Sequence, residues 1–304
     1  MEKIGLAVLA CAASASAVFL PARFSYGHGF VGNRFFPPTI ATDDPFATDE
    51  LSLPSVSIFK DPGKPATWET DAGFEFDKEI LPHVALGISD TFIYQKPSGQ
   101  TGVGGWDNTE VSAKYQFWQN DEHEAVLAVG AIVDIGGSGS TNVDVDKFNT
   151  YTPTLYFGKG FGDLPDSLDS FKPLALTGTL AQAFPARNDD SDQFQWGLAL
   201  EYSLPYLEEH VTDTGLPRPW RDMIPLVEFA MSTNENRSGE GQTTGTINPG
   251  VLWETPYFQI GAEADIPVNG HTGPHVGATV NLQIYIDDLF PTVFGHPLFF
   301  GESK

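Results

Sequence analysis

The sequence predicts an all-β protein, a transmembrane antiparallel up-and-down β-barrel of about twelve strands. Three observations support this fold class: segments of alternating apolar and polar residues, an N-terminal export signal, and connections that differ in length from one end of the strands to the other. The composition agrees, because 31 glycines, 23 prolines and 12% aromatic residues are typical of strands joined by many turns.

The first 27 residues are predicted to be a signal peptide. A short charged head containing Lys3 precedes the apolar run from Ile4 to Leu20, and small residues precede a cleavage site near Gly27, with cleavage after Ala17 as the alternative. The only cysteine, Cys11, lies in this segment. We therefore expect a mature protein without disulfides, thiolate metal sites or a thiol nucleophile.

Residues 28–52 are predicted to form an irregular N-terminal arm. The sequence HGFVGNRFFPPTIATDDPFATDE contains adjacent prolines and keeps neither a helical nor a strand period. The barrel follows over residues 53–290, and residues 291–304 are predicted to be a periplasmic tail.

Twelve segments alternate clearly enough to be predicted as strands. In FQIGAEADIPV, every second residue from Phe258 to Val268 is apolar, while the residues between them include Glu263 and Asp265. Successive side chains leave a strand on opposite faces, so this segment has one apolar and one polar face. The predicted strands are 53–60, 67–79, 84–96, 106–118, 123–136, 149–161, 172–184, 192–204, 223–233, 245–254, 256–268 and 275–288.

The connections between these strands are asymmetric. LPH, QNDE and ET are tight, whereas PSGQTGVGG, GSGSTNVDVDKFN and ENRSGEGQTTG are long and rich in glycine. Short periplasmic turns and long outer loops are typical of bacterial outer-membrane barrels. Two long connections, within 162–170 and 206–222, do not fit, because both are expected at the periplasmic end.

Alternation alone does not say whether the apolar face meets lipid or a protein core, so a secreted soluble β protein is an alternative. Lipid is favoured because the polar faces carry almost no lysine, and because aromatic residues stand near predicted strand ends, where membrane interfaces would lie. These aromatic residues are Phe117, Tyr151, Phe157, Tyr202, Trp253 and Phe258.

If the apolar face meets lipid, the polar face forms the wall of a lumen that is mainly acidic. A wall of one charge sign concentrates counter-ions, so an open pore would prefer cationic or neutral solutes; a hydrated wall without selectivity is the alternative. The predicted pore-lining residues are Glu69, Asp71, Glu75, Asp77, Glu110, Lys114, Glu124, Asp134, Glu201, Glu228, Glu263 and Asp265.

Other candidate chemistry is weak. His271 and His275 are separated by three residues that include a Gly-Pro pair in a loop, which makes a surface loop a better interpretation than a metal site. No motif combines a nucleophile with a base, so we expect neither catalytic residues nor a cofactor, and no enzyme activity. The formal net charge of −24 excludes nonspecific nucleic acid binding, because phosphates would be repelled.

The alternating strands, the arm GFVGNRFFPPT and the ending YIDDLFPTVFGHPLF resemble the outer-membrane barrels of the meta-pathway phenol-degradation and transporter-like family. The resemblance implies passage of small organic compounds across the bacterial outer membrane, in contact with its lipid and lipopolysaccharide. The chain departs from the usual ending of such barrels, because it stops at Gly-Glu-Ser-Lys after Phe299-Phe300. A plugged structural or binding barrel without transport is the competing expectation, and the solute, the state of the lumen and the oligomeric state stay open.

Overall fold

The computed structural model describes residues 29–61, 63, 65–237 and 239–299. The predicted signal peptide and the last residues of the predicted tail lie outside this part of the chain. Fifteen strands are present among the described residues. They are β1 (Phe30–Val31), β2 (Arg34–Phe35), β3 (Glu50–Asp61), β4 (Thr67–Leu81), β5 (Val84–Pro97), β6 (Val103–Trp106), β7 (Glu110–Asn120), β8 (Ala125–Asp134), β9 (Thr150–Gly160), β10 (Leu174–Pro185), β11 (Gln193–Tyr202), β12 (Met223–Asn234), β13 (Thr243–Glu254), β14 (Phe258–Pro267) and β15 (Gly277–Ile284).

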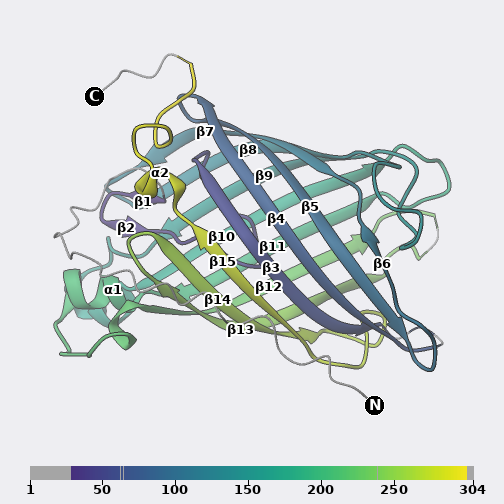
Figure 1. Cartoon of the computed structure of the whole chain (residues 1–304). Helices are drawn as coiled ribbons and strands as arrows, with labels where there is room; N and C mark the ends of the chain where they lie inside the picture. The colour runs from purple at the N-terminus through teal and green to yellow at the C-terminus, as the bar shows by residue number, and fades with distance from the viewer. Residues whose placement is uncertain (1–28, 62, 64, 238, 300–304) are drawn as a thin grey trace, which may run out of the picture.

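Twelve of these strands form a closed antiparallel barrel, which confirms the predicted fold class (Figure 1). Each strand pairs with its neighbour in sequence, and β15 pairs with β3 to close the sheet. The short β6 adds to the edge of β5 in the connection to β7, and β1 and β2 form a separate hairpin. Closure pairs every strand on both sides, as a transmembrane sheet requires.

The outer face of the barrel carries the apolar side chains of the alternating pattern. In β14, Ile260 and Ile266 are exposed, whereas Gln259 and Glu263, on the opposite face, are buried inside. The same exposure on other strands is shown by Ile58, Trp68, Leu86, Ile88, Val111, Tyr115, Val129, Tyr151, Leu155, Leu180, Leu200, Val251 and Val280. An apolar outer belt around a closed barrel matches the lipid-facing band of membrane barrels.

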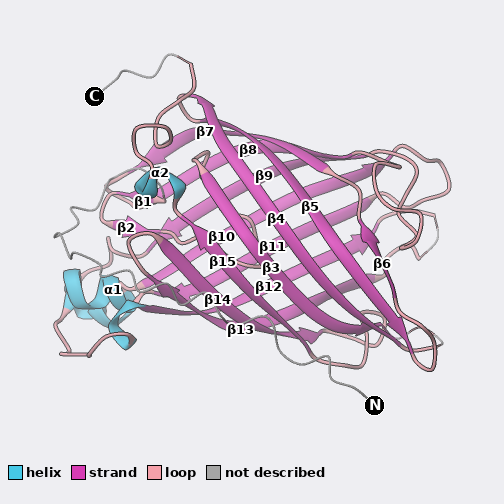
Figure 2. Ribbon diagram, in the orientation of Figure 1, coloured by secondary structure: helices cyan, strands magenta, loops and turns pink. Residues whose placement is uncertain are grey.

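The two ends of the barrel differ, as the connection lengths predict. We call the end with the tight β4–β5, β7–β8 and β13–β14 turns the turn end, and the opposite one the loop end. The long 162–170 and 206–222 connections also lie at the turn end, where Figure 2 shows the short helices near α1. The helices are η1 (Asp166–Phe171), α1 (Leu204–Tyr206), η2 (Leu207–Val211), η3 (Trp220–Asp222) and α2 (Ile286–Leu289). None in the described part of the chain is long and apolar enough to cross a membrane.

Two segments depart from the predicted strands. The predicted strand 106–118 is divided, because β6 ends at Trp106 and β7 begins only at Glu110. The last strand ends at Ile284, and α2 follows in place of the strand predicted as far as 288.

Candidate functional site

The predicted lumen residues lie on the inner face of the barrel, with one exception. Glu124 lies in the turn before β8, in a left-handed backbone conformation with φ of 45°. The residues on inner strand faces are Glu69, Asp71, Glu75 and Asp77 on β4, Glu110 and Lys114 on β7, Asp134 on β8, Glu201 on β11, Glu228 on β12, and Glu263 and Asp265 on β14. Whether they line a conducting path stays a prediction.

Several of these carboxylates are hydrogen-bonded to neutral side chains rather than to cations. Gln95 Nε2 donates to Glu69 at 2.8 Å, and Thr279 Oγ1 donates to Asp265 at 2.9 Å. Asn108 Nδ2 donates to Asp134 at 3.1 Å. These carboxylates stand in the half of the barrel nearer the loop end, so this part of the wall keeps its acidic character.

The other half of the lumen contains the N-terminal arm. The arm enters as the β1–β2 hairpin at the turn end and continues against the inner wall until β3 begins at Glu50. Its side chains are largely buried, including Val31, Phe36, Phe46 and Ala47. The arm therefore occupies the lumen from the turn end to about its middle.

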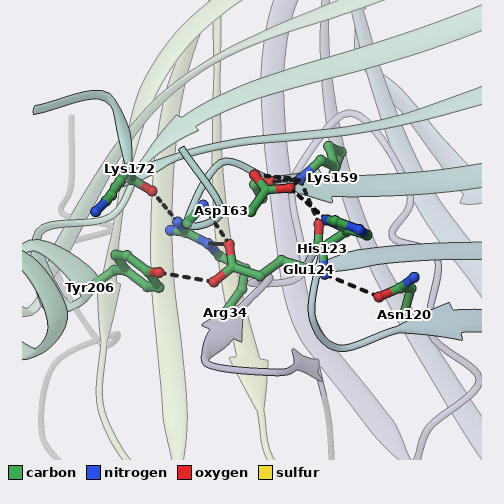
Figure 3. Close-up of polar contacts among 10 residues, drawn as sticks. Arg34, Asn120, His123, Glu124, Lys159, Asp163, Lys172 and Tyr206 are labelled. Atoms are coloured by element: carbon green, nitrogen blue, oxygen red, sulfur yellow. Dashed lines mark hydrogen bonds and ion pairs between the residues drawn. The ribbon is translucent and has the colours of Figure 1, made fainter. Parts of the chain in front are cut away.

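Arg34 fastens the arm to the turn end. The Arg34 side chain is 0% exposed; its Nε lies 3.3 Å from Glu124 Oε2, and its Nη1 donates to the Pro173 carbonyl at 3.0 Å (Figure 3). Nη2 donates to the Lys172 carbonyl, and the guanidinium group stacks on the Tyr206 ring at 3.6 Å from its centroid. A buried guanidinium needs partners of this kind, because an unpaired charge inside a protein is costly.

Glu124, the ion-pair partner of Arg34, accepts two further hydrogen bonds. Tyr206 Oη donates to Glu124 Oε1 at 2.9 Å, and the Gly162 amide donates to Oε2 at 2.9 Å. Burial, together with the nearby Glu124 charge, raises the pKa of Tyr206 to about 12, so its hydroxyl keeps the proton that it donates. Burial lowers the pKa of Arg34, although Glu124 opposes this shift.

Two wall residues of opposite charge hold the middle of the arm. Glu228 accepts hydrogen bonds from three consecutive arm amides, those of Ile40, Ala41 and Thr42, at 2.7, 3.0 and 2.7 Å. Lys114 Nζ donates to Asp43 Oδ1 at 2.8 Å and to the Asp44 carbonyl at 2.9 Å. The arm is therefore bound to β12 and β7 within the lumen.

The end of the arm is fastened through Asp49. Its carboxylate accepts from Lys78 Nζ at 2.6 Å and from the Glu79 amide at 2.6 Å, both on β4. It also accepts from the Gly295 amide at 2.8 Å, in the segment that follows α2. The predicted tail thus meets the end of the arm at the turn end.

Apolar patches of the inner wall complete the arm site. One cluster joins Val31, Phe36 and Phe46 of the arm to Val126 and Ala175 of the wall. A second joins Phe35 and Ile40 to the wall residues Ile224, Leu226 and Leu252. Exposing these apolar side chains to a water-filled lumen would be unfavourable. The arm covers them and removes that cost.

Two inward glycines make room for the arm. A Cβ atom at Gly261 would lie 2.6 Å from Ile40 Cδ1, and one at Gly197 would lie 2.9 Å from the Thr42 side chain. Gly261 belongs to the polar face of FQIGAEADIPV, where the sequence pattern gives no reason for a residue without a side chain. The close approach of the arm supplies that reason.

Sequence reasoning missed Arg34, Asp49, Tyr206 and the apolar inner wall. One signal was available: in MIPLVEF both faces of the strand are apolar before Glu228, which a wall facing only water and lipid does not require. The two long connections at the turn end were a second signal. The full β9–β10 and β11–β12 connections supply Gly162, Lys172, Pro173 and Tyr206, all of which contact the Arg34–Glu124 pair.

Two open pockets lie at the ends of the barrel. One of about 410 Å³ at the turn end is lined by residues that include Gly32, Asp121 and Asp163. The other, of about 450 Å³, lies at the loop end and includes Glu240 and His271. His271 lies in the β14–β15 connection, where its amide donates to Asn269 Oδ1 at 3.0 Å, and His275 lies in the same connection.

The fold is similar to that of solved outer-membrane channels. An outer-membrane channel from Pseudomonas putida F1 has a TM-score of 0.51 and 12% identity, covering 82% of this chain and 98% of that chain. The KdgM porin in complex with disordered oligogalacturonate has a TM-score of 0.45 and 13% identity, covering 76% and 98%. The NanC porin has a TM-score of 0.45 and 11% identity, with the same coverage. The sequence matches no family model and no curated protein.

Proposed function

We propose that the protein is a bacterial outer-membrane channel for small cationic or neutral solutes, and that its N-terminal arm holds the channel closed from the turn end. The observation that carries this proposal is a closed barrel with an apolar outer belt and an acidic inner wall. An apolar outer belt does not suit a soluble secreted protein. The likeness to the Pseudomonas putida channel supports the fold on which the proposal rests.

The acidic wall supports the choice of solute charge. Glu69, Asp71, Glu110, Asp134 and Asp265 stand nearer the loop end than the arm does, with neutral side chains as hydrogen-bond partners. Clustered negative charge inside a low-dielectric wall attracts cations and opposes anions. The family resemblance adds small organic compounds as the solute class.

The arm decides when the channel conducts. Its polar contacts with Glu228, Lys114 and the Glu79 amide are hydrogen bonds that water could replace if the arm left the lumen. A structural barrel that stays plugged is the second candidate, favoured by the complete burial of Arg34 in its anchor.

Reconstitution into planar lipid bilayers tests these functions. In a potassium chloride gradient, we expect the reversal potential to move toward the potassium equilibrium potential. The combined substitution Glu69→Gln, Asp71→Asn and Glu110→Gln should reduce this selectivity. The matched control should keep most of the cation selectivity. It combines Asp144→Asn, Asp189→Asn and Glu240→Gln in the loop-end connections. Anion preference would overturn the acidic-wall argument, and absence of conductance even when mild urea loosens the arm would favour the plugged barrel.

A further inference from the structure

The arm amides at Glu228 reproduce the donors of an ammonium group. Three N–H groups from Ile40, Ala41 and Thr42 converge on one carboxylate that is 0% exposed. A primary ammonium group offers the same number of donors, three. The arm segment supplies these donors without a positive charge, because its side chains are isoleucine, alanine and threonine.

One oxygen of a second carboxyl group, beside Glu228, lacks an N–H donor. Glu263 is 5% exposed and lies within hydrogen-bonding reach of Glu228, yet its Oε1 has no partner among the described residues. Two carboxyl groups this close repel each other unless a proton or a cation lies between them.

Asn248 adds another unused acceptor. Its Nδ2 points to Glu263 Oε2 at 3.4 Å, while its Oδ1 has no partner in the described part of the chain, and the residue is 4% exposed. Buried acceptors without donors are rare in native proteins. The three side chains therefore form a buried group in which Glu263 Oε1 and Asn248 Oδ1 have no N–H donor among the described residues.

Neither Lys114 nor Arg34 fills this need. Lys114 is occupied by Asp43 and the Asp44 carbonyl of the arm. Arg34 is held by Glu124 and two carbonyl groups at the turn end. Apart from a proton shared between the two carboxyl groups, a positive charge for Glu228 and Glu263 would therefore have to come from outside this set of contacts.

We propose that Glu228, Glu263 and Asn248 form a binding site for the primary ammonium group of an organic cation, and that the arm segment Ile40–Thr42 occupies this site in the closed state. A bound ammonium group would replace the three N–H donors that the arm now gives to Glu228. It would also bring a positive charge, which the arm segment does not have. Organic amines thus compete with the arm, and their binding releases it from β12. This site would control the arm that closes the proposed channel, so its biological role rests on the proposed function.

Release of the arm can be measured without any conductance. Thr42 is 2% exposed, so the substitution T42C, in a chain that also carries C11S, places a single protected thiol at the site. The probe is ethylammonium chloride, and the readout is the rate at which a maleimide modifies the thiol in detergent micelles. We expect ethylammonium to accelerate modification about tenfold or more, since competing ligands commonly couple to this extent.

Three controls separate the ammonium site from general loosening of the arm. Tetramethylammonium chloride at equal ionic strength carries the same charge without N–H donors and should act no more strongly than sodium chloride. E263Q should abolish the response to ethylammonium, whereas E240Q, in the exposed β12–β13 connection, should retain it. K114M should raise the basal rate, because Asp43 loses its partner, and still respond to ethylammonium.

The outcomes are distinct. Equal acceleration by both ammonium ions, no acceleration by ethylammonium, or an undiminished response of E263Q would each overturn the ammonium site. A channel that conducts cations but shows one of these results keeps the proposed function and loses only this site. A barrel that never conducts but responds to ethylammonium as described keeps the site and loses the channel function.

Discussion

A guanidinium group inside the barrel is stable only when its N–H groups and its charge are matched. Arg34 meets this condition through Glu124, two main-chain carbonyls and the Tyr206 ring. Three of these four partners, the two carbonyls and the Tyr206 ring, come from connections that are long without an evident reason in the sequence. The Arg34–Glu124 pair explains why those connections cover the turn end.

Replacing Arg34 with methionine should free the hairpin end of the arm. Glu124 would keep only the Tyr206 hydroxyl and the Gly162 amide, and loss of one partner of a buried ion pair costs about 3–5 kcal/mol. Limited proteolysis of the folded protein should therefore cut the arm at least about a hundredfold faster. The control Arg187→Met removes an exposed pair with Asp189 and should change nothing. An arm that stays resistant in R34M would show that apolar packing alone holds it.

Asp163 gives the turn end a pH dependence. Although burial opposes the shift, hydrogen bonds from His123 and Lys159 lower the pKa of Asp163 below its usual value. A lowered pKa in the folded state means that this stabilisation is present above the unfolded pKa and is lost as the pH falls through the folded one. Asp163→Asn should thus lower the unfolding midpoint at neutral pH, and the difference from wild type should vanish in acid. The effect should be small, about 0.2–1 kcal/mol, because the side chain is 29% exposed. A difference that persists unchanged in acid would contradict the charge argument.

At the scale of the elements, the arm accounts for the apolar residues on the inner faces of two strands. The inner faces of β8 and β12 carry Val126, Ile224 and Leu226, which would be unfavourable against water. The arm places Phe36 and Ile40 on these patches, and inward glycines leave space for it. The strand periodicity was readable from the sequence, but the partner of the inner apolar residues was not, because it lies more than eighty positions away in the chain.

Asp49 joins three elements at the turn end: the arm, β4 and the segment after α2. Asp49→Asn should weaken this junction, since a carboxylate bound to an ammonium group and two amides contributes more than a neutral amide can. Amide hydrogen exchange should become about tenfold faster or more at Gly295, and also faster at Glu79. The hydrogen bonds from Leu298 and Phe299 to β4 should loosen with it. Unchanged exchange at Gly295 would mean that the Phe294–Phe76 contact fixes this segment.

At the scale of the whole molecule, the apolar outer belt indicates that the outer face of the barrel contacts lipid rather than water. Val129 stands in the middle of β8 and is 41% exposed on the outer face. Val129→Arg should destabilise the barrel in lipid by about 2–4 kcal/mol, the cost of a charged side chain near the middle of a bilayer. Urea titrations of the protein in lipid vesicles measure this cost. Thr141→Arg in the exposed β8–β9 connection is the control, and an equal effect of both substitutions would contradict a lipid-facing belt.

The sequence by itself determined the twelve strands, the apolar and the polar face of each, and the difference between the two ends. These features follow from local periodicity and from the composition of turns, which neighbouring residues express without reference to the rest of the chain. Only the tertiary structure decided that the arm lies inside the lumen, that Glu124 anchors Arg34, and that Glu228 binds main-chain amides. Such contacts depend on which residues closure of the sheet brings together, and an irregular segment like the arm carries no period from which its partners could be inferred.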